Sequence, residues 1–291
     1  MKFEVSHRTV YRYSQPVSIS HHLLHLTPRP ASFQRCGDFA IEISPPPSIR
    51  AADVDYFGNP TTFVTIQQTH RELVLHALSM IDVTERPVPA AAATPAWESV
   101  RQLVREDRAQ ETLEALELTF SSSFIPMLPQ LEAYALASFT PGRPVLEAAR
   151  ELTHRIFKDF RYQPGATNLA TSVAEVFAMR RGVCQDFAHL QIACLRLLGL
   201  PARYVSGYLL TRPASGKERL VGADASHAWL SIWVPGQGWI DLDPTNDMIP
   251  GDEHITVAWG RDYADVSPVS GVMFGGGEHE VLVSVDVATA G

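Results

Sequence analysis

The chain has 291 residues, a formal net charge of −8 at pH 7 and a sequence pI of about 5.7. Its content of 45% hydrophobic and 19% charged residues is typical of a globular protein and excludes wholesale disorder, collagen-like repeats and coiled coils. Lysine occurs at only three positions, and no Lys/Arg cluster could form a basic face, so nucleic acid is not an expected partner.

The cysteines and the N-terminus narrow the class of protein further. Cys36, Cys184 and Cys194 cannot all pair and form no C-x-x-C, which argues against a disulfide scaffold and the commoner structural zinc sites. The N-terminus has no apolar segment typical of a secretory signal, and no stretch approaches ~18 consecutive apolar residues. We therefore expect a cytoplasmic protein without a membrane span or a membrane partner.

Residues 1–88 predict an N-terminal β-rich domain. Apolar and polar residues alternate at roughly strand period in the runs 3–11, 39–43, 62–66 and 72–78, and turn residues and prolines separate these runs. Several short strands at this spacing indicate an antiparallel sheet or sandwich. We expect this domain to carry no catalytic residue.

Residues 89–143 predict a helical connecting region that follows a linker rich in proline and alanine. Thr94 and Pro95 suit the N-cap and the first turn of a helix. From Trp97 onwards, apolar residues recur at helical spacing. A helix is therefore expected to begin near Pro95.

Residues 144–250 predict a core in which helices precede strands. Helices are expected from Pro144, from Ser172 and from Cys184, the last ending before Gly199. Strand-like runs follow at 202–210, 227–234 and 239–243. Residues 251–291 form a C-terminal segment in which 281–287 predict a returning strand. This order indicates an α+β fold.

Cys184 is the candidate nucleophile. Gly182 lies just before it and an apolar helical pattern follows, which places the thiol at a helix N-terminus. Free N–H groups and the positive end of the helix dipole favour the thiolate there, and the thiolate is the nucleophilic form. Cys194 falls in the apolar stripe of the same helix and Cys36 in a loop, so both are expected to be ordinary residues.

Cysteine catalysis also needs an imidazole and a group that orients it. His227 begins the run 227–234 on its less apolar face, where it could point into a cleft. Asp241 and Asp243 share one face of the run 239–243. Because side chains alternate along a strand, periodicity cannot choose between the two carboxylates.

Three blocks around these residues resemble the catalytic blocks of the transglutaminase-like superfamily. They are G-V-C-Q-D-F at 182–187, S-H-A-W at 226–229 and G-W-I-D-L-D-P-T-N at 238–246. Members of this superfamily share a papain-like Cys-His-Asp triad. The resemblance implies a core in which the helix that bears the cysteine packs on an antiparallel sheet.

The resemblance to the bacterial branch of the superfamily extends over nearly the whole chain. Residues 7–13 and 25–30 resemble its N-terminal β-domain, and residues 260–268 resemble its C-terminal segment. Bacterial members of this branch are usually described as cysteine proteases. The order and spacing of the blocks in this chain agree with that branch.

By this resemblance, Cys184 is the nucleophile, His227 the general base and acid, and Asp243, which lies in D-P-T, the orienting carboxylate. Tyr162 is a candidate oxyanion donor, although a tyrosine that merely packs is the commoner case. Trp229 and Gln185 are candidates for the substrate groove, although strand aromatics are more often ordinary packing.

The implied activity is thiol acyl transfer on a peptide or protein amide substrate. With water as acceptor the enzyme is a peptidase or amidase, which we expect; with an amine it is a protein-glutamine γ-glutamyltransferase. A non-catalytic peptide-binding module on the same fold is a further alternative. No cofactor and no metal are expected, because His21, His22 and His25 lack a completing ligand nearby. The oligomeric state is not predicted.

The hairpin between His227 and Asp243 allows a geometric prediction. Directly opposed residues of an antiparallel pair point to the same side, and side chains alternate along each strand. His227 and Asp243 both have odd numbers, so they share a face only if an odd-numbered residue lies opposite an odd-numbered one and an even-numbered residue opposite an even-numbered one. A three-residue loop at 235–237, or one bulge, satisfies this by pairing Val234 with Gly238. An even, unbulged hairpin would turn Asp243 away from His227.

Overall fold

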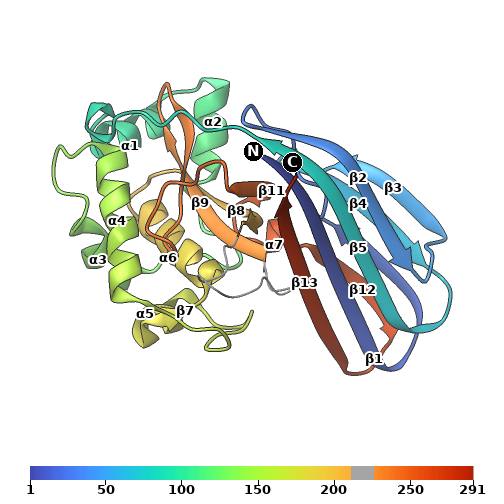
Figure 1. Cartoon of the computed structure of the whole chain (residues 1–291). Coiled ribbons are helices and arrows are strands. Elements are labelled where there is room, and N and C mark those ends of the chain that lie inside the picture. The colour runs from blue at the N-terminus through green and yellow to red at the C-terminus, as the bar shows by residue number, and fades with distance from the viewer. Residues whose placement is uncertain (211–225, 291) are drawn as a thin grey trace, which may run out of the picture.

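The computed structural model describes residues 1–210 and 226–290, which form a β-only region beside a region of helices packed on a second sheet. In Figure 1 the β-only region lies to the right and the helices to the left. Both termini lie between them, because the first and last strands pair with each other. This mixture of helices and antiparallel sheets confirms the predicted α+β class.

The β-only region is one seven-stranded sheet. Its order is β2-β5-β1-β4-β3, with β12 and β13 also paired to β1. The strands are β1 (Lys2–Leu24), β2 (Gln34–Ser44), β3 (Ile49–Val54), β4 (Pro60–Ile66), β5 (His70–Val83), β12 (Val269–Gly275) and β13 (His279–Thr289). The sheet that residues 2–83 begin is therefore completed by two strands from the end of the chain.

β1 is long enough to serve two groups of partners. Its first part pairs with β5 and β13, and its last part pairs with β4 and β12. The ladder with β5 is interrupted between Arg12 and Val17. Pro16 lies in this gap, and proline has no N–H to contribute to a ladder.

A shared apolar core holds the seven-stranded sheet against the helices. Phe3 and Val5 of β1 and Val285 and Val287 of β13 belong to the same buried cluster as the helical region. The other end of the sheet has a core of its own, which includes Leu73. One end of the sheet therefore cannot separate from the helical region without exposing apolar surface to water.

The helices begin close to where the sequence predicts them. The predicted starts at Pro144, Ser172 and Cys184 are confirmed to within one residue, and the helix expected near Pro95 begins at Trp97. The helices are α1 (Trp97–Glu106), α2 (Gln110–Glu117), α3 (Glu132–Leu136), α4 (Val145–Asp159), α5 (Val173–Met179), α6 (Cys184–Leu197) and α7 (Tyr263–Val266), with short 3₁₀ turns at Ala91–Ala93 and Pro129–Leu131.

The second sheet is antiparallel, with the order β10-β9-β8-β11. Its strands are β8 (Ala202–Leu209), β9 (Ser226–Val234), β10 (Gly238–Leu242) and β11 (His254–Gly260). The helix α6 packs against β8 and β9, and its residues from Asp186 to Arg196 are buried. The helix that bears Cys184 thus lies on an antiparallel sheet, as the resemblance implies.

The β9–β10 hairpin has the predicted odd loop. Val234 pairs with Gly238, so that three residues, 235–237, form the connection. Gly236 and Gly238 have φ of 72° and 76°, which glycine adopts without strain. The ladder continues to Leu242 opposite Leu230, which places Asp243 on the face that also carries His227.

The structure has strands that the sequence did not predict, namely β3, β11, β12 and the two-residue strands β6 (Arg161–Tyr162) and β7 (Arg181–Gly182). In residues 1–210 and 226–290, no helix combines the length and apolar character needed to cross a membrane. The cytoplasmic location stays a prediction.

Candidate active site

Cys184 is the first residue of α6 and its side chain is partly exposed. The turn before it is held by Asp186, whose carboxylate accepts the Val183 N–H at 2.7 Å and the Thr167 hydroxyl at 2.6 Å. Gly182 is required here, because a Cβ at this position would lie 2.6 Å from the Asp186 carboxylate oxygen. These contacts hold the thiol at the N-terminus of α6, where the first backbone N–H groups have no partner within the helix.

His227 lies near the start of β9, directly opposite Gly207 of β8. A Cβ at Gly207 would lie 2.0 Å from the Ile255 carbonyl oxygen and 2.6 Å from the Trp229 ring. The absence of a side chain at Gly207 therefore allows β11 and the Trp229 ring to approach β8 closely at the position opposite His227. Trp229, which this packing admits, lies beside the His227 ring, with ring centroids 5.9 Å apart.

We expect Gly207→Ala to lower the free energy of unfolding by about 1–3 kcal/mol, because the added methyl overpacks a site bounded by backbone. It should also slow alkylation of Cys184 by iodoacetamide, since Trp229 lies beside the His227 ring. Thermal unfolding and alkylation rates measure both effects. Gly251→Ala is the control, because that position has no atom within 4 Å of the added Cβ. Equal behaviour of the two variants would contradict the expectation.

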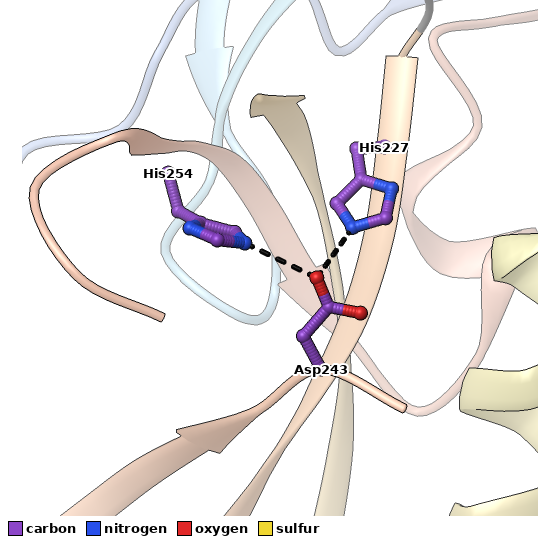
Figure 2. Close-up of side chains that lie close together, drawn as sticks. All are labelled: His227, Asp243 and His254. Carbon is purple, nitrogen blue, oxygen red and sulfur yellow. Dashed lines mark hydrogen bonds and ion pairs between the residues drawn. The ribbon is translucent and has the colours of Figure 1, made fainter. Parts of the chain in front are cut away.

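Asp243 receives five hydrogen bonds and has no exposed surface. Its Oδ2 accepts from His227 Nε2 at 2.8 Å, His254 Nε2 at 3.2 Å and Asn246 Nδ2 at 2.7 Å (Figure 2). Its Oδ1 accepts the backbone N–H groups of Thr245 at 2.9 Å and Asn246 at 3.2 Å. Burial raises the pKa of Asp243, but these bonds outweigh it and hold the pKa below its ordinary value. The carboxylate is therefore ionised.

His227 lies between the carboxylate and the thiol. Its Nε2 donates to Asp243, and the ring also forms a hydrogen bond with Cys184. Burial lowers the pKa of His227, but the hydrogen bonds and negative charges of the two partners raise it above 6.5. The structure thus brings the three residues of the expected triad into one chain of hydrogen bonds.

Asp241 shares the strand face of Asp243 but has different partners. It forms an ion pair with Arg86 and accepts hydrogen bonds from Ser231 and from Trp229 Nε1, the latter at 2.9 Å. The Asp241 carboxylate is therefore paired with side chains inside the sheet, and the carboxylate that binds His227 is that of Asp243. Geometry chooses between the two carboxylates where periodicity could not.

Of the two roles considered for Trp229, the structure shows ordinary packing and not the lining of a groove. Its ring has no exposed surface and its N–H is bound to Asp241. Its position on the less apolar face of the strand did not show whether that face is exposed. In the structure this face is covered by residues of the β-only region and its linker, such as Gln34 and Arg86. Gln185, beside Cys184, is partly exposed and stays a candidate for substrate contact.

Tyr162 lies next to the nucleophile through the short parallel pairing of β6 (Arg161–Tyr162) with β7 (Arg181–Gly182). Its ring is half exposed and packs edge-on against Phe187. Burial and the charge of Cys184 raise the pKa of the Tyr162 phenol. The phenol therefore keeps its proton and has a hydrogen to donate, so Tyr162 stays an oxyanion candidate.

The other two cysteines lie in environments that disfavour the thiolate. Burial raises the pKa of Cys194 to about 12. Burial and the neighbouring Asp38 raise the pKa of Cys36. Neither thiol is therefore expected to react at neutral pH.

The N-terminal histidines bind separate partners. His21 contacts the Thr65 hydroxyl, and His25 contacts Asp55. Among the residues that the structure describes, the only group of three ligating side chains close enough to share a metal ion is His227, Asp243 and His254, with ligand atoms within 4.8 Å of one another.

Two residues near the candidate triad were not predicted from the sequence, namely His254, which contacts Asp243, and Arg86, which binds the His254 carbonyl. A signal existed for His254, because it begins H-I-T-V-A-W, a run with strand-like alternation. No local signal existed for Arg86, which lies in the linker and reaches the catalytic sheet only through the fold.

Comparison with known proteins identifies two regions of the chain. Residues 3–82 match the family described as bacterial transglutaminase-like N-terminal region, and residues 133–244 match the transglutaminase-like superfamily. An uncharacterized protein of Mycobacterium tuberculosis is 42% identical, over 98% of this chain and 92% of that protein.

Two further relatives carry functional names. A protein-glutamine γ-glutamyltransferase of Pseudomonas aeruginosa is 34% identical over 135 residues, which cover 43% of this chain and 20% of that protein. The crystal structure of a candidate cysteine protease from Cytophaga hutchinsonii is similar with a TM-score of 0.75, at 22% identity over 99% of this chain and 90% of that one. At this identity, the second match concerns the fold alone.

Proposed function

We propose that this chain, which belongs to the transglutaminase-like superfamily, is a thiol acyl-transfer enzyme that acts on amide bonds. The observation that carries the proposal is the chain of hydrogen bonds from buried Asp243 through His227 to Cys184 at a helix N-terminus. A carboxylate, an imidazole and a partly exposed thiol in this order suit covalent catalysis.

The proposed reaction has two halves. In the first, the Cys184 thiolate attacks the amide carbonyl carbon, and the Cys184 backbone N–H and the Tyr162 phenol receive the negative charge that forms on oxygen. His227 then gives its proton to the departing amine as the C–N bond breaks, which leaves a thioester on Cys184. In the second, His227 takes a proton from the acceptor as the acceptor attacks the thioester; the C–S bond breaks, the acyl group leaves on the acceptor, and the Cys184 thiolate and the His227 imidazolium are regenerated.

We favour water as the acceptor. Cys184 is partly exposed, and the His227 side chain keeps 10% of its surface exposed, so water reaches the thioester. The name of the Pseudomonas aeruginosa relative supports an amine acceptor as the alternative.

A glutamine-containing peptide, incubated with and without a fluorescent primary amine such as dansylcadaverine, tests the acceptor. We expect cleavage or deamidation without the amine, and loss of both in Cys184→Ala. Strict dependence on the amine would make the chain a transferase. Absence of turnover, together with slow alkylation of Cys184, would contradict the enzyme and favour the binding module.

The protonation of His227 predicts the alkaline limit of activity. Asp243 and Cys184 raise the pKa of His227 above 6.5, so the imidazolium persists above that pH and is lost as pH rises through the raised value. We expect kcat/KM to stay high above pH 6.5 and to fall on the alkaline side. Asp243→Asn should move this fall to lower pH, because it removes the negative charge. An alkaline limb that the substitution leaves unmoved would contradict the assignment.

A further inference from the structure

His254 places a second imidazole on the Asp243 carboxylate. It begins β11, has no exposed surface, and its Nε2 lies 3.2 Å from Asp243 Oδ2. Figure 2 shows His227 and His254 approaching the same carboxylate oxygen from different strands. The Trp229 ring packs edge-on against His254, with ring centroids 5.2 Å apart, and fixes the plane of the imidazole.

The surroundings of His254 identify which ring nitrogen carries the proton. Nδ1 is buried and has no hydrogen-bond partner among the described residues. A proton on Nδ1 would therefore be a buried, unpaired donor, which is costly. A proton on Nε2 instead has the Asp243 carboxylate as its acceptor, so the geometry favours the Nε2–H tautomer. In this tautomer His254 donates to Asp243 without adding a second positive charge.

His254 is itself held by the linker that follows the N-terminal strands. Arg86 donates through Nη2 to the His254 carbonyl at 3.2 Å and forms an ion pair with Asp241. The Arg86 guanidinium also lies over the Phe33 ring, 3.7 Å from its centroid. The linker therefore ties the first residue of β11 to β10, the strand that leads directly to Asp243.

We propose that His254 is a positioning residue, which holds the Asp243 carboxylate in the orientation that His227 requires. The role rests on the proposed function, because it presumes that His227 and Cys184 are the reacting pair. It also gives the N-terminal region a role at the site, because Arg86 binds the His254 carbonyl and so helps to position this residue. Three groups then restrain Asp243 Oδ2 together, namely His227, His254 and Asn246.

The test compares His254→Phe, which keeps a ring but removes the donor, with His254→Gln, which keeps an N–H donor. The rate of Cys184 alkylation by iodoacetamide is measured from roughly pH 5 to pH 9, where imidazoles and thiols titrate. We expect His254→Phe to react about ten-fold more slowly at neutral pH, the order of effect of losing a hydrogen bond to a charged group. His254→Gln should restore most of the rate.

With p-nitrophenyl acetate as substrate, we expect the loss in His254→Phe to fall on kcat and to leave KM within about two-fold, because His254 touches no substrate. His22→Phe is the matched control. His22 is also buried with an unpartnered Nε2, but it lies in β1 of the other sheet. We expect that control to keep the wild-type alkylation profile.

An alkylation profile of His254→Phe equal to wild type would overturn the proposal, as would a folded His254→Gln variant no better than His254→Phe. If the phenylalanine variant does not fold, NMR of the histidine ring nitrogens in the unaltered chain decides. A proton on Nε2 supports the proposal and a proton on Nδ1 overturns it. Alkylation of the unaltered chain that rises with chelator also overturns it, because the cluster would then hold a metal. If His254→Phe slows the alkylation of Cys184 as expected but the unaltered chain turns over no amide, the proposed function is refuted and the positioning role of His254 is not.

Discussion

Replacement of Cys184 by serine is expected to lower kcat/KM for p-nitrophenyl acetate and for amides by at least about 10⁴-fold, the effect of losing a catalytic nucleophile. The hydroxyl of serine gives up its proton far less readily than a thiol, so the His227 pair that activates a cysteine cannot activate it. Cys184 is partly exposed at the end of a helix, so the fold should not change. Activity, alkylation and thermal unfolding are measured on the same sample.

Cys36→Ser is the control for this prediction. Cys36 is partly exposed like Cys184, but burial and Asp38 raise the pKa of its thiol. We expect the control to keep wild-type activity, and peptide mapping to find the alkyl group on Cys184 alone. Alkylation concentrated on Cys36 or Cys194 would refute the assignment of the nucleophile.

The second large effect distinguishes Asp241, which lies in β10, from Asp243, which directly follows that strand. Asp243→Asn removes the charge that stabilises the His227 imidazolium, so we expect kcat to fall by about 10³-fold or more, with a folded protein. Asp241→Asn instead leaves the largely buried Arg86 guanidinium without its ion-pair partner. We expect that change to cost about 3–5 kcal/mol of unfolding free energy.

Urea unfolding and Cys184 alkylation separate these two results. Rates are compared on the folded fraction of each variant. The folded fraction of Asp241→Asn should lose no more than the roughly ten-fold expected of His254→Phe, because Asp241 is linked to the site only through Arg86 and Trp229. The folded fraction of Asp243→Asn should react far more slowly. Slow alkylation in Asp241→Asn together with a near wild-type rate in Asp243→Asn would mean that the two aspartates have been assigned the wrong way round.

Sequence alone was sufficient for the elements that carry the candidate site. The helix from Cys184 follows from its apolar spacing and from the Gly199 stop, which are rules that act within a few residues. The odd loop of the hairpin follows from strand parity only because the resemblance to the superfamily requires the carboxylate to face His227. The resemblance to the superfamily then supplied the choice of Asp243, which periodicity left open.

What sequence could not predict depends on contacts between distant parts of the chain. The sequence left open whether Trp229 lines a groove or packs in the interior, and residues of the first third of the chain decide this by covering its strand face. His254 contacts Asp243 only because β11 pairs with the far side of β8. Arg86 reaches Asp241 across 155 residues of sequence. No local pattern encodes such pairings, because tertiary packing decides them.

Covalent catalysis by Cys184 is tested most directly by the mass of the intact chain after brief mixing with p-nitrophenyl acetate, followed by peptide mapping. We expect a burst of p-nitrophenolate with one acetyl group per chain, bound to Cys184 as a thioester that water then removes. The burst should be absent in Cys184→Ser and strongly slowed in Asp243→Asn. Acetylation at another residue, or turnover that continues in Cys184→Ser, would contradict covalent catalysis by Cys184.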